Sequence, residues 1–156
     1  MIIEKANPED AKILTEITFD GKAFWGFSKA ELSEWTELLT ISPDYITENC
    51  VYKLILNSEI AGYYSYIMIN ESEIKLDNLF LFQKYIGKGF GKLMMEDFLK
   101  KAKNLKQKII ILDSEPNAEN FYKKFGFITF DKKESVIKNR FLAKMKLILP
   151  LQYDNK

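Results

Sequence analysis

Three glycines at alternating positions, Gly87, Gly89 and Gly91, separate a strand-like apolar run from an amphipathic, helix-like run. The first run is Leu79 to Phe82, and the second starts near Phe90. Glycine allows positive φ and lets main-chain amides approach a ligand that side chains would keep away. The first turn of a helix adds unbonded N–H groups and a partial positive charge. The segment therefore predicts an anion-binding loop, and a ligand-free glycine turn is the alternative that it leaves open.

The spacing of these glycines excludes two common nucleotide-binding loops. A Walker loop needs four residues between its first glycine and a Gly-Lys-Ser/Thr triplet, whereas here Lys92 is followed by Leu93. The dinucleotide fingerprint Gly-x-Gly-x-x-Gly also fails, because Gly91 comes one residue too early. The sequence therefore predicts neither a nucleoside triphosphatase nor a dinucleotide-binding protein.

Length and composition predict a folded protein. The chain has 156 residues, of which 47% are hydrophobic and 14% aromatic, and this is enough to form a core. Its apolar runs are too short or too charged to cross a bilayer, and residues 1–5 lack a signal-peptide pattern. We expect a single domain over 1–156 that is soluble and cytoplasmic and has no membrane partner.

The chain contains no histidine and only one cysteine, Cys50. This excludes disulfides, the usual zinc-ligand sets, and both Ser-His-Asp and Cys-His catalysis. Any general acid or base must then be Asp, Glu, Tyr, Lys or a water molecule, and we predict no metal site. Cys50 lies just before an apolar strand-like run and is interpreted as a packed thiol.

Charge is distributed unevenly along the chain. Residues 1–74 contain 5 Lys and Arg against 13 Asp and Glu (net −8), whereas residues 75–156 contain 18 against 9 (net +9). Solvated surface charge explains such a split without any ligand. Alternatively, the basic half binds a polyanionic ligand and the acidic half binds a cationic partner. The charge pattern leaves both interpretations open.

The order of the expected elements predicts the fold class. Apolar periodicity, capping signals and turn residues indicate helices at 7–21, 28–39, 90–102 and 116–125, a short turn at 42–44, and strands at 2–6, 51–56, 61–70, 73–82, 108–113, 127–131 and 140–149. The helical crossover predicts that strand 108–113 is parallel to strand 73–82. We expect an α+β fold with a mixed, mostly antiparallel central sheet flanked by helices.

Two segments, in this order, resemble the signatures of the GNAT acetyltransferase superfamily. The first, Tyr85-Ile86-Gly87-Lys88-Gly89-Phe90-Gly91, is similar to the family's acyl-CoA pyrophosphate loop. The second, Asn117-Ala118-Glu119-Asn120-Phe121-Tyr122-Lys123-Lys124-Phe125-Gly126-Phe127, is similar to its second signature. Two motifs in the right order, separated by one expected helix and one expected strand, indicate a GNAT-like fold over nearly the whole chain.

The resemblance implies roles for individual residues. Strand residues present backbone groups to the pantetheine arm of acetyl-CoA, loop amides hold its pyrophosphate, and Tyr122 protonates the departing thiolate. The implied cofactor-binding residues are Leu79, Phe80, Leu81, Gly87, Lys88, Gly89, Phe90, Gly91, Lys92 and Asn117. The chain departs from the family pattern at Ile86, where Gln or Arg is usual, and at Glu115, where the asparagine of the second signature often stands.

The acceptor is predicted to be an amine. Trp25, Phe27 and Glu31 are expected to line its pocket, although aromatic residues in such places also serve packing alone. Because an alkylamine is mostly protonated at neutral pH, a base or a water must remove its proton. The candidate bases are Asp77, Asp113 and Glu115. Each is equally explained as a solvated charge at a strand end, and we assign no base.

These observations predict an N-acetyltransferase that moves an acetyl group from acetyl-CoA, its co-substrate, to a primary amine of a small molecule or peptide by direct attack. Tyr122 is the predicted general acid. The alternative is a non-catalytic acyl-CoA sensor or scaffold on the same fold, which has no use for the acid. Nucleic acid is not a predicted partner, because the basic half lacks arginine-rich and exposed aromatic surfaces. The acceptor amine, the acyl chain length and a possible homodimer stay open.

Overall fold

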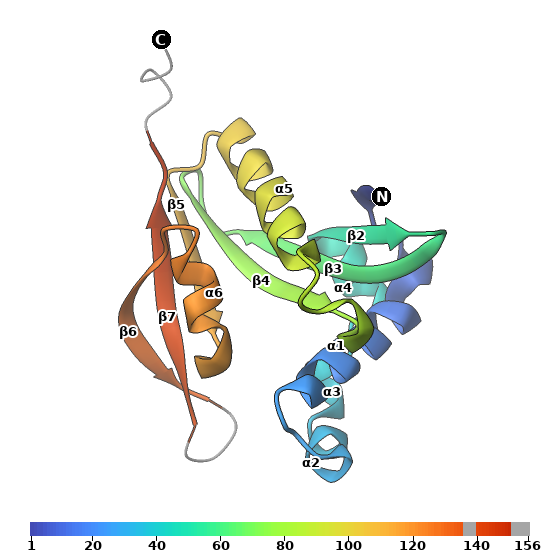
Figure 1. Cartoon of the computed structure of the whole chain (residues 1–156). Helices are drawn as coiled ribbons and strands as arrows, with labels where there is room; N and C mark the ends of the chain where they lie inside the picture. Colours follow the sequence, from blue (N-terminus) through green and yellow to red (C-terminus); the bar gives the residue numbers. More distant parts are fainter. Residues whose placement is uncertain (136–139, 151–156) are drawn as a thin grey trace. The chain divides into compact units, whose positions relative to one another are not determined.

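The structure is a computed structural model that describes residues 1–135 and 140–150 (Figure 1). These residues form a seven-stranded sheet in the order β1-β2-β3-β4-β5-β7-β6. The chain divides into two compact units: unit 1 is Met1–Tyr66 with Asn78–Leu99, and unit 2 is Ile67–Asp77 with Lys100–Lys156. The expected α+β class, a mixed sheet with flanking helices, is confirmed.

The elements follow one another in the predicted order. The strands are β1 (Ile2–Lys5), β2 (Cys50–Leu56), β3 (Glu59–Met68), β4 (Glu73–Leu81), β5 (Ile109–Ser114), β6 (Ile128–Glu134) and β7 (Phe141–Ile148). The helices are α1 (Ala11–Phe24), α2 (Lys29–Glu34), α3 (Thr36–Leu39), α4 (Pro43–Glu48), α5 (Phe90–Asn104) and α6 (Glu119–Lys123), with short 3₁₀-helices η1 (Pro8–Asp10), η2 (Gln83–Tyr85) and η3 (Pro116–Ala118). No helix of the described ranges is long and apolar enough to span a membrane.

Unit 1 is built on the antiparallel pairing of β1 with β2 and of β2 with β3. Helices α1 and α4 contribute apolar side chains to a core against these strands. The buried members of this core are Ala6, Leu14, Ile17, Ile41, Ile46, Val51 and Tyr63. Because removal of apolar surface from water is the main stabilising term in folding, this core fixes α1 to the strands.

Helix α1 extends beyond the end predicted at Gly21 and reaches Phe24. Gly21 is buried within the helix, where a Cβ atom would lie 2.8 Å from Cδ1 of Phe80 and 3.4 Å from the carbonyl oxygen of Leu81. The glycine therefore permits a close approach of α1 to β4 instead of ending the helix. The sequence pattern alone does not distinguish these two uses of a glycine.

The second predicted helix, from Ser28 to about Leu39, is interrupted. Its predicted capping box is present, with Ser28 and Glu31 each accepting a hydrogen bond from the other's main-chain amide. The helix then breaks at Trp35, which has φ −106° and ψ 21°, so that α2 and α3 are separate. The Trp35 ring packs edge to face on Phe27, with ring centroids 5.3 Å apart. Tertiary packing of an aromatic side chain thus accompanies the break.

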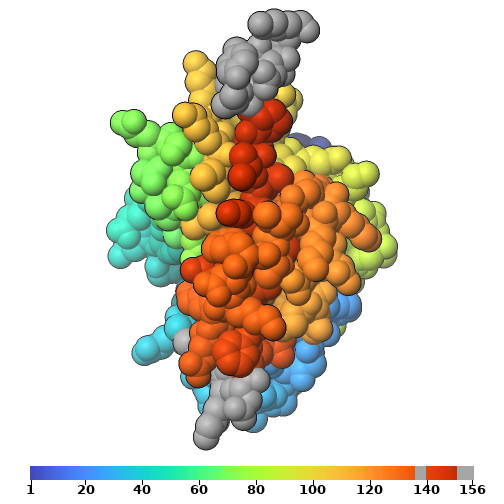
Figure 2. Space-filling model, turned by 90° about the vertical axis from the view of Figure 1, so that its left-hand side faces the viewer, coloured from blue at the N-terminus to red at the C-terminus, as the bar shows by residue number. Residues whose placement is uncertain are grey.

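Unit 2 contains the parallel pair that the helical crossover predicted. Its recorded pairs run from Glu73–Ile109 to Lys75–Ile111. Strand β5 pairs antiparallel with β7, and β7 with β6; Figure 2 looks onto this β6–β7 hairpin, coloured orange to red. Helix α6 lies beside β7 (Figure 1). Helix α6 ends at Lys123, two residues before the predicted end at Phe125; Gly126 has φ +97°, the left-handed conformation predicted for it.

Candidate functional site

The glycine loop joins η2 to α5 in unit 1. Gly87 and Gly89 have φ values of +82° and +90°, which only glycine adopts readily. No heavy atom lies within 4 Å of the place that a Cβ atom would occupy at either residue. The predicted bend between a strand and a helix is therefore present, and the space beside both glycines is open.

The main-chain amides of this loop are available to a ligand. The amide of Leu93 is the first of α5 to be bonded, and it donates to the carbonyl oxygen of Gly89 at 3.2 Å. Residues 86–89 form a turn, but within the described part of the chain none of the amides of residues 87–92 makes a short, well-aligned hydrogen bond. Unbonded amides and the helix dipole together give this end of α5 a positive potential. The loop therefore fits a diphosphate, whose oxygens are negative and accept hydrogen bonds.

Contacts outside the loop hold its two ends. The rings of Tyr85, before the loop, and Phe90, after it, meet edge to face with centroids 6.1 Å apart. Just before Tyr85, the main-chain amide of Gln83 donates to Asp20 Oδ2 of α1 at 2.7 Å. The two ends of the loop are therefore in contact with each other, and the segment before the loop is bonded to α1.

Strand β4 brings the predicted residues Leu79, Phe80 and Leu81 to the start of this segment. A Cβ atom at Gly62 of β3 would lie 2.6 Å from both the carbonyl oxygen of Phe80 and Cδ2 of Leu81, so the two strands approach closely here. The ladder between β4 and β5 is recorded only for Glu73 to Lys75. Leu79, Phe80 and Leu81 therefore come after the residues of β4 that pair with β5.

Tyr122 lies on α6 of unit 2, where its ring contacts those of Phe121 and Phe127 at centroid distances of 5.2 and 6.0 Å. Tyr122 as a whole is half-buried, and burial of its hydroxyl raises its pKa above that of a free phenol, because the ionised form loses hydration. The Tyr122 hydroxyl makes no hydrogen bond to any residue that the structure describes. Tyr122 is therefore a neutral phenol near pH 7. Asn117, on η3 of the same unit, is exposed.

Two of the three candidate bases are already ion-paired within unit 2. Asp113 Oδ2 lies 3.4 Å from the ammonium groups of both Lys75 and Lys133. Glu115 Oε2 lies 2.8 Å from Arg140 Nε. These ion pairs already engage both carboxylates, so neither residue is favoured as the base. Among residues 1–135 and 140–150, no group of three or more His, Cys, Asp or Glu side chains is arranged to hold a metal ion.

The predicted acceptor residues Trp25, Phe27 and Glu31 lie in and beside the connection between α1 and α2. Phe27 is buried, and its ring packs on Trp35. Glu31 Oε1 accepts a hydrogen bond from the amide of Ser28 at 3.0 Å. Packing thus accounts for Phe27 and helix capping for Glu31, whereas Trp25 is half-buried and keeps an accessible surface.

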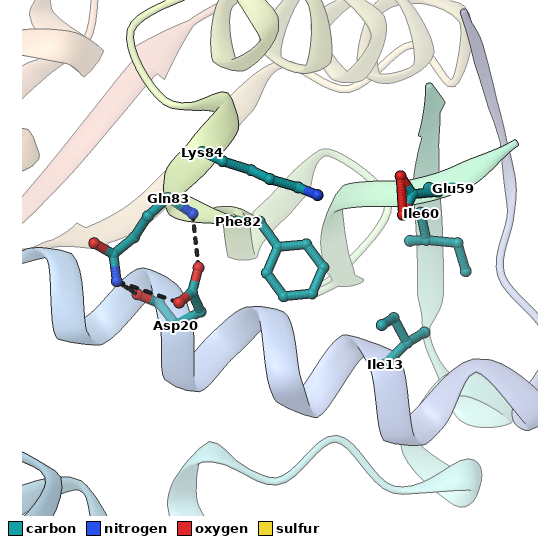
Figure 3. Close-up of a pocket in the computed structure, with 7 residues that line it drawn as sticks. All are labelled: Ile13, Asp20, Glu59, Ile60, Phe82, Gln83 and Lys84. Carbon is teal, nitrogen blue, oxygen red and sulfur yellow. Dashed lines mark hydrogen bonds between the residues drawn. The ribbon is translucent and has the colours of Figure 1, made fainter. Parts of the chain in front are cut away.

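A pocket of about 750 Å³ lies beside the turn after β4 in unit 1 (Figure 3). Its walls come from α1, the start of β3 and the turn itself. The lining residues are Ile13, Asp20, Glu59, Ile60, Phe82, Gln83 and Lys84. None of the residues assigned above to the cofactor or the acceptor lines it. Figure 3 shows Asp20 and Gln83 bonded to each other on one side, with Glu59 and Ile60 on the other.

Sequence reasoning missed the contact between Asp20 and Gln83. The two residues are 63 positions apart, and no local pattern relates a carboxylate inside a helix to a residue after a strand. The one signal in the sequence was that a polar residue, Gln83, directly follows the apolar run Leu79 to Phe82. The contact becomes visible only when α1 packs beside the end of β4.

A family model described as an acetyltransferase (GNAT) domain matches residues 27–149 of the chain. This range contains both predicted signature segments. None of the curated protein sequences is similar enough to match the chain.

Solved structures share the fold. The PaiA N-acetyltransferase from Thermoplasma acidophilum, in complex with coenzyme A, has a TM-score of 0.80 and 18% identity, over 95% of this chain and 98% of that one. The ribosomal-protein-S18-alanine N-acetyltransferase from Escherichia coli has a TM-score of 0.75 and 15% identity, over 99% of this chain and 97% of that one. A GNAT family acetyltransferase from Elizabethkingia anophelis with acetyl-CoA bound has a TM-score of 0.61 and 20% identity, over 78% of this chain and 84% of that one. Identities this low show the fold alone.

Proposed function

The chain belongs to the GNAT acetyltransferase family, and we propose that it transfers an acetyl group from acetyl-CoA to a primary amine of a small molecule or peptide. The observation that carries the proposal is the set of unbonded amides at residues 87–92, where α5 begins. Coenzyme A in the T. acidophilum protein and acetyl-CoA in the E. anophelis protein support the same co-substrate here.

In this proposal the loop holds the diphosphate of acetyl-CoA. Gly87 and Gly89 keep the bend free of side chains, and the amides donate to the phosphate oxygens. Lys88 and Lys92 are exposed, and neither has an ion-pair partner among the described residues, so their charge is available to phosphate. The backbone of residues 79–81 receives the pantetheine arm, which is consistent with its place beyond the recorded β4–β5 ladder.

Tyr122 is the proposed general acid. Acetyl transfer breaks the thioester C–S bond, and the thiolate leaves more readily when a hydroxyl gives it a proton. A phenol whose pKa is raised by burial stays protonated at neutral pH and can act in this way. The main-chain amide of Leu81 is proposed as the donor that stabilises negative charge on the carbonyl oxygen. A water is proposed as the proton acceptor for the amine, because Asp113 and Glu115 are ion-paired; Asp77 is the candidate base that these ion pairs leave open.

The acceptor class is proposed from charge and from similar proteins. The first 74 residues carry a net charge of −8, which favours a cationic amine. The E. coli protein acts on an alanine of ribosomal protein S18, and so a peptide amine belongs in the proposal beside small amines. Of the two aromatic residues predicted to line the acceptor pocket, Trp25 keeps an accessible surface and Phe27 is buried, so Trp25 is the one proposed to contact the acceptor. A cytoplasmic location and a homodimer stay predictions.

A thiol-release assay tests the function. Purified protein is incubated with acetyl-CoA and a panel of polyamines, amino sugars, aminoglycosides and peptide N-termini, and coenzyme A affinity is measured separately by calorimetry. We expect thiol release above the acceptor-free rate with at least one amine class. Coenzyme A binding without release for any amine would favour a non-catalytic acyl-CoA sensor. Absence of binding would refute the proposal.

A further inference from the structure

We propose that Asp20 is a positioning residue for cofactor binding: it fixes the turn that leads into the glycine loop and so pre-orients the amides of residues 87–92. The inference rests on the proposed function and extends it to a residue on α1 that has no place in either signature segment. Asp20 and Gln83 both belong to unit 1 and are joined by hydrogen bonds.

Three hydrogen bonds join these two residues (Figure 3). The main-chain amide of Gln83 donates to Asp20 Oδ2 at 2.7 Å. The side-chain amide of Gln83 donates to the carbonyl oxygen of Asp20 at 2.9 Å and to Asp20 Oδ1 at 3.2 Å. Gln83 is the first residue of η2, and the first amides of any helical turn have no partner inside it. The carboxylate of α1 therefore caps this turn from another element, with a charge-assisted bond.

The turn transmits this anchor to the loop. The amide of Tyr85 donates to the carbonyl oxygen of Phe82 at 2.9 Å, and that of Ile86 donates to Gln83 at 3.1 Å. Ile86 directly precedes Gly87, the first glycine of the loop. The position and direction in which the loop starts therefore follow from the position of Gln83.

The neighbours of Asp20 on α1 hold the residues just before the turn. Gly21 allows contact with the Phe80 ring, and Lys22 Nζ lies 5.8 Å from the centroid of that ring. Helix α1 is itself fixed, since its Leu14 and Ile17 are fully buried in the core of unit 1. A rigid helix thus holds the segment from Phe80 to Gln83.

Pre-orientation matters here because the loop contains glycines. Glycine loses more conformational freedom than any other residue when its backbone is fixed. A loop that starts from an anchored turn has less freedom to lose when it binds a ligand, and the ligand then binds more tightly. Loss of the Asp20 carboxylate is therefore expected to weaken coenzyme A binding without any change in the loop sequence.

The test compares three variants by calorimetry with coenzyme A. Asp20→Ala removes both carboxylate acceptors and is expected to raise Kd about tenfold, as for loss of a charged hydrogen bond. Asp20→Asn keeps an oxygen that accepts from the Gln83 amide, and its Kd is expected to stay within about threefold of wild type. Glu16→Ala is the matched control, because Glu16 is an exposed carboxylate one turn earlier on α1 with no recorded contact in the described ranges; its affinity is expected not to change.

A second readout separates positioning from general stability. In the ligand-free Asp20→Ala protein, amide hydrogen exchange is expected to increase at residues 83–86 and to stay unchanged in the core of α1. In steady-state kinetics, KM for acetyl-CoA is expected to rise while kcat changes little, because Asp20 does not contact the reacting atoms. If Asp20→Ala fails to fold, Gln83→Ala removes the two side-chain bonds and is expected to raise Kd about threefold.

The outcomes separate this inference from the proposed function. If the wild-type protein does not bind coenzyme A, both fail. If it binds and Asp20→Ala binds equally well, only the role of Asp20 fails. An equal loss of affinity in Asp20→Ala and Glu16→Ala would indicate a general effect on α1 and would also overturn the inference.

Discussion

At the scale of single residues, Gly89 is the position where a side chain should matter most. Its φ of +90° costs an L-residue roughly 1–2 kcal/mol, and a β-branched residue more. Gly89→Val is expected to raise the Kd for coenzyme A at least tenfold, as measured by calorimetry, because the loop must leave its present geometry.

Gly26 provides a control of the same strain for this substitution. It has φ +93° and, like Gly89, no heavy atom within 4 Å of a Cβ position, but it lies outside the loop. Gly26→Val is expected to lower the melting temperature by about as much as Gly89→Val does, and to leave coenzyme A affinity unchanged. If both variants lost affinity equally, the anion-binding role of the loop would be rejected.

Tyr122 allows a prediction about kcat and pH. Tyr122→Phe is expected to lower kcat by roughly 10² or more, the usual size of a general-acid effect, with coenzyme A affinity preserved. Because burial raises the pKa of Tyr122, its phenol stays protonated as the pH rises through neutrality. The wild-type kcat should therefore show no decline from this group up to about pH 10, the pKa of a free tyrosine. Full activity of the variant across the pH range would remove Tyr122 from the mechanism.

At the scale of elements, a side-chain hydrogen bond joins α6 to β6. Thr129 donates to the carboxylate of Glu119, and this bond, aided by Lys123, lowers the pKa of Glu119. A carboxyl whose pKa is lowered by folding stabilises the protein above its unfolded pKa, and this contribution is lost as the pH falls through the folded value.

Thr129→Val is therefore expected to move the pKa of Glu119 back toward its ordinary value, as an NMR titration would show. The variant should be less stable than wild type in urea at about pH 7, and the difference should shrink as the solution becomes acidic. An unchanged pKa, or a stability difference that persisted in acid, would contradict this assignment.

The elements are also where sequence reasoning was strongest. The Ser28 capping box, the left-handed conformation of Gly126 and the parallel pairing of β4 with β5 are all present. The misplaced boundaries include Gly21, which stays within α1, Trp35, which divides the second helix, and the end of α6, which lies at Lys123. Gly21 lies against the ring of Phe80, 59 residues away, and Trp35 packs on Phe27; apolar periodicity registers neither contact.

At the scale of the whole molecule, ligand binding is expected to stabilise the fold. Free coenzyme A at about 100 times its Kd should contribute roughly 2.7 kcal/mol and raise the melting temperature of a chain of this size by roughly 5–10 °C. Scanning calorimetry of the wild type and of Gly89→Val checks this, since the variant should show a much smaller shift. No shift in the wild type under saturating conditions would contradict binding to the folded state.

The sequence by itself determined the order of elements, the bend at Gly87 and Gly89, and the lack of histidine that limits the chemistry. These properties depend on neighbouring residues or on composition, so they can be inferred without a fold. Only the tertiary structure decided that Asp20 meets Gln83 and that Glu115 is paired with Arg140. Those contacts join residues far apart in the chain, and they form because buried cores bring helices and strands together at distances that no local pattern encodes.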